Sequence, residues 1–137
     1  MDDQGKSGGL QQDALFVIAG DMNADPHDGD GLQQAVQQLT KHPLIHRNIV
    51  PTSLGGQQAA AQGRANQQHA GKPAHDTADF PDNLPGNLRV DYVLPSKTLQ
   101  PLAAGVFWPS SELLKAQLLK ASDHRLVWLD VVNIAPR

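Results

Sequence analysis

Four segments of the chain have the apolar pattern of β-strands. Residues 14–19 and 125–132 are nearly continuous apolar runs, residues 88–94 alternate apolar and polar side chains, and residues 99–107 follow a weaker pattern that proline and glycine interrupt. Continuous runs are typical of strands buried on both faces, whereas alternation is typical of strands with one covered face. We therefore predict four strands in one mixed, mainly antiparallel sheet.

Two further segments have the spacing of amphipathic helices. In the first, apolar residues recur three and four positions apart after Asp30, and Gln33 stands where the partner of a capping box would be. In the second, serines precede an early glutamate and a late lysine, which would complement the helix dipole. The sequence predicts helices over 31–42 and 110–120 on one face of the sheet. Strands and helices together define an α/β (α+β) fold.

Residues 55–73 differ from the rest of the chain in composition. They are rich in glutamine, alanine, glycine and asparagine and show no apolar periodicity. Such a segment buries too little apolar surface to offset the entropy lost on ordering. We expect a long exposed loop there, a flexible insertion within a single domain that spans residues 1–137.

Composition narrows the range of partners. Lysine and arginine number 11 against 14 aspartates and glutamates, and the net charge of −3 gives no overall basic surface that could hold nucleic acid by its phosphates. Cysteine is absent, which excludes disulfides and thiolate metal ligands. The apolar runs are far shorter than a membrane span. We therefore expect nucleic-acid contacts to be local if they occur, and no membrane partner.

Three short acidic motifs lie against predicted strands. Asp21 and Asn23 follow the first strand in the letters GDMN, Asp91 lies in RVDY, and Asp123 and His124 belong to SDH before the last strand. A carboxylate beside an apolar core needs a cation, a hydrogen-bond donor or a metal to offset its desolvation. Three such motifs in one small chain suggest a shared polar centre.

Each acid also has a plainer structural explanation. Asp21 could cap a loop, Asp91 could pair with Arg89 or Arg125, and Asp123 could be a turn residue, because aspartate is common in caps and turns. Both explanations stay open at the level of single residues. The order of the three motifs along the chain distinguishes a shared polar centre from separate structural roles better than any single motif does.

Taken in order, the motifs resemble the C-terminal signature of the endonuclease/exonuclease/phosphatase (DNase I-like) superfamily. The resemblance runs from residue 16 to 132 and leaves out only the glutamine-rich segment. It implies that the chain is the C-terminal part of a layered α/β sandwich. It also implies that the other face of the sheet packs against the N-terminal half of the domain, or against a second copy of the chain.

The resemblance further implies a role for each residue of the motifs. Asp21 would orient or deprotonate the attacking water, and Asn23 would donate a hydrogen bond to a phosphate oxygen. Asp91 would orient His124, whose imidazolium would stabilise the developing negative charge. Asp123 would belong to the metal region, where oxygen ligands suit Mg²⁺ or Mn²⁺. Further metal ligands in the family come from the N-terminal half.

The expected function is metal-dependent hydrolysis of a phosphate ester by the intact protein, with phosphodiesters, monoesters and nucleic acid among the candidate substrates. The alternative is an inactive structural or assembly half with the same fold. The letters at 76–80 and 105–109 resemble a group of large secreted or periplasmic bacterial members, which implies such a location.

Two other chemistries fit the sequence poorly. Residues 21–25 match the start of an EF-hand calcium loop, but Pro26 replaces its glycine and Leu32 replaces its bidentate glutamate. Residues 122–124 contain serine, aspartate and histidine, yet three consecutive residues cannot converge as a hydrolase triad.

Overall fold

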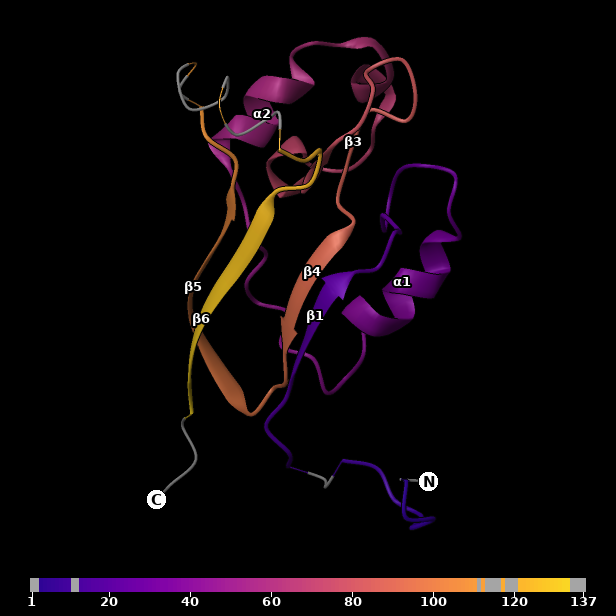
Figure 1. The fold of residues 1–137 in the computed structure, drawn as a ribbon, viewed down its shortest axis with the longest axis vertical. Coiled ribbons are helices and arrows are strands. Elements are labelled where there is room, and N and C mark those ends of the chain that lie inside the picture. The colour runs from indigo at the N-terminus through magenta and orange to yellow at the C-terminus, as the bar shows by residue number, and fades with distance from the viewer. Residues whose placement is uncertain (1–2, 11–12, 111, 113–116, 118–120, 134–137) are drawn as a thin grey trace.

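The computed structural model describes residues 3–10, 13–110, 112, 117 and 121–133. Strands pair in three antiparallel ladders, accompanied by two α-helices and two short 3₁₀ helices within these ranges (Figure 1). The fold-class prediction of mixed α and β structure with antiparallel strands is confirmed. The elements are β1 (Val17–Asp21), α1 (Gln33–Thr40), α2 (Leu54–Ala60), η1 (Arg64–Gln68), η2 (Pro73–His75), β2 (Ala78–Asp79), β3 (Asn87–Leu88), β4 (Asp91–Pro95), β5 (Leu99–Phe107) and β6 (Leu126–Asn133).

The first ladder joins β1 to β4, with Val17 opposite Pro95 at one end and Asp21 opposite Asp91 at the other. Alternation along the pair turns one set of side chains toward α1, which lies beside the ladder (Figure 1). That face forms a core in which the buried members are Val36, Ile45, Tyr92 and Leu94. The ladder ends in two facing carboxylates.

The second ladder joins β5 to β6 as a hairpin-like pair of long strands, with Phe107 opposite Leu126. One of its faces contributes to a core cluster formed by Ala59, Val106, Val127 and Trp108. The other face is solvent-exposed and apolar, and its large exposed side chains are Phe107, Leu126, Trp128 and Val132.

The third ladder is a short pairing of β2 with β3. The neighbouring segment, residues 55–73, differs from the sequence prediction. Residues 55–73 do not form one long exposed loop, because α2 and η1 lie within them. Gly55 and Gly56 are buried, and a Cβ on Gly55 would come within 2.2 Å of the Trp108 carbonyl oxygen. The segment packs by close approach of glycine backbone, which leaves no apolar periodicity in the sequence.

Several boundaries also differ from expectation. The described strands pair in separate two-stranded ladders, where one continuous sheet was expected. The first strand is displaced from 14–19 to Val17–Asp21, because the ladder continues to the Asp21 position opposite Asp91. The expected helix over 110–120 falls largely outside the described residues. Among the described residues, no helix has the length and apolarity needed to cross a bilayer.

The start of α1 differs from the capping-box prediction. The residue before its first turn is Leu32, and no side chain caps the helix. The Gln33 side chain instead donates to the backbone carbonyl of His27. Asp30 is therefore free of a capping role.

Candidate active site

The paired strands β1 and β4 place two acids at the same end of the first ladder. Asp21 and Asp91 are register partners, so their side chains lie on the same face of the ladder. One ligand atom from each of them and one from His124 lie within 4.8 Å of one another. Like charges directly opposite in a ladder are destabilising, so a neighbouring cation is favoured between them. Of the five residues expected in one cluster, Asp21, Asp91 and His124 are brought together here.

Residues 77–79 contact the SDH motif and so position His124 beside this cluster. The backbone N–H of Thr77 donates to Leu88 at 2.9 Å, while the Thr77 carbonyl accepts from Arg125 at 2.7 Å. The segment thus lies between β3 and the SDH motif, two stretches that are distant in sequence. An isolated bridge also pairs Ala78 with His124.

The side chains of His124 and Asp91 form a direct hydrogen bond of 2.9 Å, as the sequence predicted. The acceptor is a carboxylate oxygen, so Nδ1 of the ring is the donor and Nε2 is left for another partner. Partial burial alone would lower the pKa of His124, but the hydrogen bond and charge of Asp91, together with the charges of Asp21 and Asp123, outweigh it and raise that pKa. The ring is thereby biased toward its protonated form.

Thr77 positions Asp91, a role that the sequence analysis missed. This threonine is buried, and its hydroxyl oxygen accepts from the backbone N–H groups of Val90 at 3.0 Å and Asp91 at 2.9 Å. It fixes the start of β4 where the strand enters the site. The only sequence signal was the weak family resemblance of the letters around it.

Arg125 stabilises the turn formed by residues 122–124 through hydrogen bonds of its side chain. One guanidinium nitrogen donates to an Asp79 carboxylate oxygen at 3.0 Å, another donates to the Ser122 carbonyl at 2.6 Å, and the group lies 4.7 Å from the Trp108 ring centre. The plainer explanation that Asp91 pairs with Arg125 is therefore wrong. The arginine pairs with Asp79, and this leaves Asp91 to the histidine.

Asn23 follows the ladder in a left-handed backbone conformation with φ of 47°. Asparagine tolerates this region better than most residues. Its N–H donates to Asp21 Oδ1 at 2.7 Å. Asp21 is thus both a turn-forming residue and a member of the cluster, so the loop-cap explanation and the site explanation hold together.

Asp123 is exposed and does not belong to the group of close ligand atoms within the described part of the chain. Its charge contributes to the raised pKa of His124, which places it near the ring. Its backbone carbonyl accepts from the Asp79 N–H at 2.8 Å. A metal-binding role for Asp123 stays a prediction.

The donors of the cluster suit a hard divalent ion. Asp21 is exposed, and Asp91 and His124 are partly buried, so an ion can reach them from solvent. Carboxylate oxygens are the ligands that Mg²⁺ and Mn²⁺ prefer. Since His124 already donates to Asp91, the oxygens of Asp21 are the more available ligands.

The chain matches the model of the Endonuclease/Exonuclease/phosphatase family over residues 2–124. It therefore belongs to this family of nuclease- and phosphatase-type hydrolases, which generally depend on divalent metal ions. No curated protein and no solved structure showed significant similarity to it.

Proposed function

We propose that the intact protein hydrolyses phosphate esters in a reaction that depends on Mg²⁺ or Mn²⁺. The observation that carries the proposal is the Asp91–His124 hydrogen bond beside the exposed carboxylate of Asp21. An oriented imidazole that is biased toward protonation, next to an exposed carboxylate, supplies both an anion-stabilising group and a proton acceptor.

In this proposal each side chain has a separate task. Asp21 accepts the proton of the attacking water, and the Asn23 amide donates to a phosphate oxygen without adding charge. The Nε2–H of His124 donates to the charge that develops on the phosphoryl group, while Asp91 keeps the ring oriented. A bound divalent ion would polarise the phosphoryl oxygen, with Asp123 as its oxygen donor on this chain.

The second candidate is a structural or assembly half of a larger site. The specific observation in its favour is exposed apolar surface on both long ladders, with Val17 46% and Leu126 68% exposed. Surface of this kind is typical of protein contacts. We propose that it meets either the N-terminal half of the domain, which would also complete the metal site, or a second copy of the chain.

The two candidates are separated by hydrolysis of a generic phosphodiester and a monoester by the intact protein. We expect turnover with Mg²⁺ or Mn²⁺, loss of turnover with a chelator, and recovery when the metal is restored. His124→Ala should remove the activity, while Asp3→Asn, a change of an exposed acid outside both long ladders, should leave it unchanged. Metal-independent turnover, or turnover that survives His124→Ala, would refute the proposed mechanism.

A further inference from the structure

A cavity of about 250 Å³ adjoins the proposed catalytic cluster. Two of its lining residues connect it to the cluster. Asn23 is hydrogen-bonded to Asp21, and the Phe80 ring meets the His124 ring edge-on at a centroid distance of 5.6 Å. A substrate whose phosphate reaches His124 would therefore place the group next to that phosphate in the cavity.

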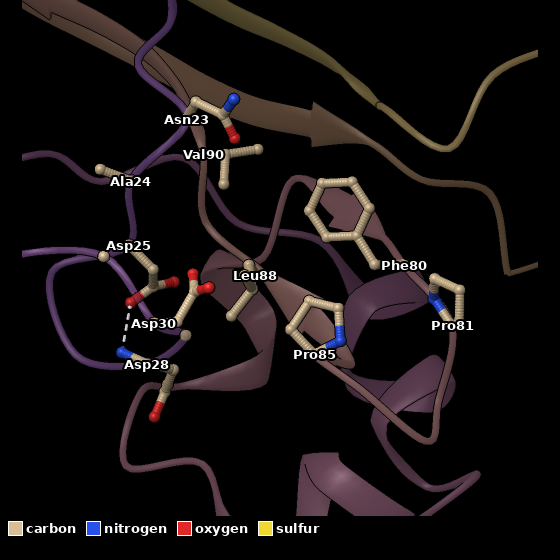
Figure 2. Close-up of a pocket in the computed structure, with 12 residues that line it drawn as sticks. Asn23, Ala24, Asp25, Asp28, Asp30, Phe80, Pro81, Pro85, Leu88 and Val90 are labelled. Carbon is tan, nitrogen blue, oxygen red and sulfur yellow. Dashed lines mark hydrogen bonds between the residues drawn. The ribbon is translucent and has the colours of Figure 1, made fainter.

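The cavity has two chemically different walls (Figure 2). One wall is apolar and consists of Phe80, Pro81, Pro85, Leu88 and Val90. Across from Phe80, Pro81 and Pro85 lie three carboxylates, from Asp25, Asp28 and Asp30. A flat group with apolar faces and hydrogen-bond donors on its edge would satisfy both walls.

Two of the three acids are already occupied by backbone N–H groups. Asp25 is buried and accepts from His27 at 2.7 Å, Asp28 at 2.9 Å and Arg89 at 2.6 Å. These bonds hold the loop in shape. They leave Asp25 with little capacity for a ligand.

The second acid is occupied as well, and the third is not. Asp28 accepts from Ala70 at 2.7 Å and Gly71 at 2.9 Å. Asp30 caps no helix, and none of the hydrogen bonds found among the described residues involves its carboxylate. Figure 2 shows that carboxylate lying across the cavity from Pro85 and near Leu88. Asp30 is the free acceptor of the cavity.

We propose that this cavity binds the base of a small nucleotide ester, with Asp30 as the residue that selects it; the inference rests on the proposed function. The base would lie against the Phe80 and Pro85 side of the cavity and donate an amino N–H to Asp30. Three carboxylates repel a group that carries further phosphates, and the net charge of −3 does not favour a long polyanion. A mononucleotide-sized ester satisfies both limits.

The test compares two esters that lose the same leaving group at the same phosphorus. Adenosine 5′-(p-nitrophenyl phosphate) carries a base, and methyl p-nitrophenyl phosphate does not. For the intact protein we expect a higher kcat/KM with the adenosine ester. Asp30→Ala should reduce that value about tenfold or more, as loss of a charged hydrogen bond does, and leave the methyl ester unaffected.

A second variant fills the cavity instead of removing the acceptor. Gly31 lines the cavity, and a Cβ added there meets no atom within 4 Å, so the side chain of Gly31→Leu starts from an unobstructed position and adds bulk at the lining. It should lower kcat/KM for the adenosine ester alone. Asp3→Ala is the matched control, since it removes an exposed acid outside the cavity and outside the β5–β6 ladder.

Binding of adenosine 5′-monophosphate, followed by NMR shifts, separates this inference from the proposed function. If neither ester is hydrolysed but the nucleotide binds and Asp30→Ala weakens binding, the base site stands and the hydrolase function falls. If the methyl ester is hydrolysed and Asp30→Ala affects both esters equally, the base site is wrong. Preference for p-nitrophenyl phosphorylcholine would assign the cavity to an ammonium group and overturn the proposal.

Discussion

The β1–β4 and β5–β6 ladders expose different kinds of side chains. The β1–β4 ladder ends in Asp21 and Asp91, and these polar side chains converge with His124. The β5–β6 ladder exposes an apolar face, with Leu126 and Trp128 on alternate positions of one strand. Polar groups that converge favour chemistry, whereas apolar groups that spread over a face favour contact. The difference predicts that substitutions on the first ladder affect turnover and those on the second affect association.

The largest effect is expected at Asp21. Asp21→Asn should lower turnover of the intact protein by about two to four orders of magnitude, because removal of a general base has roughly that effect. The melting temperature should change little, since the side chain is exposed. Asp3→Asn, a change of an exposed acid outside both ladders, is the matched control. A large loss of stability with normal turnover would favour a purely structural role for Asp21.

Next in size is a pH effect at Asp76, close to the acid-rich end of the first ladder. Burial first, and then the charges of Asp25 and Asp28, raise the pKa of Asp76 from 3.8 to about 8. The folded state therefore favours the protonated carboxyl, and its stabilising contribution is full below about pH 4 and is lost as pH rises through about 8. Each pKa unit corresponds to about 1.4 kcal/mol, so the loss amounts to several kcal/mol.

Asp76→Asn should flatten this dependence. Urea denaturation at pH 5, 7 and 9 would show the variant gaining stability relative to the natural chain as pH rises. An equal pH dependence in both proteins would mean that Asp76 ionises normally in the folded state.

A smaller effect is expected where α2 supports the second ladder. Gly55→Ala would place a Cβ within 2.2 Å of the Trp108 carbonyl oxygen, a backbone atom that cannot move aside cheaply. Overpacking of this kind destabilises by about 1–3 kcal/mol. Gly8→Ala, whose Cβ meets nothing within 4 Å, is the control for the change of residue type. Equal urea midpoints for the two variants would contradict the close packing.

The smallest effect on folding is expected on the exposed face of β6. Leu126→Gln should leave stability within about 0.5 kcal/mol, as surface substitutions usually do. It should also weaken self-association of the isolated chain, which sedimentation velocity measures over a range of concentrations. We expect the natural chain to self-associate and to hydrolyse phosphate esters no faster than buffer with Mg²⁺. A compact, active monomer at high concentration would refute this expectation.

The sequence predicted the strands from local apolar patterns, and the family resemblance predicted a five-residue cluster of which three members come together. Apolar runs located the ladders, and motif order brought Asp21, Asp91 and His124 together. The residues that support the strands and the cluster act through contacts that leave no recognisable pattern in the sequence. Thr77 acts through one buried hydroxyl, and Gly55 acts through the absence of a side chain.

Asp30 shows the opposite kind of error. Its position before a helical pattern favoured a cap, since aspartate is among the preferred N-cap residues. The helix starts two residues later than such a cap requires, because Leu32 is its N-cap residue. Local propensity therefore predicted an N-cap role for Asp30 that is incorrect. Only the tertiary structure places its side chain at the cavity.

The register of the first ladder also bears on how the protein folds. Asp21 and Asp91 are 70 positions apart in a chain of 137 residues, so their pairing requires closure of a loop of about half the chain. Phe107 and Leu126 are only 19 positions apart and can meet much sooner. Distant pairings lose more chain entropy before any contact stabilises them, and they form slowly. Asp21, Asp91 and His124 should therefore come together last, at a stage when the apolar hairpin of a partly folded chain is already exposed to other chains.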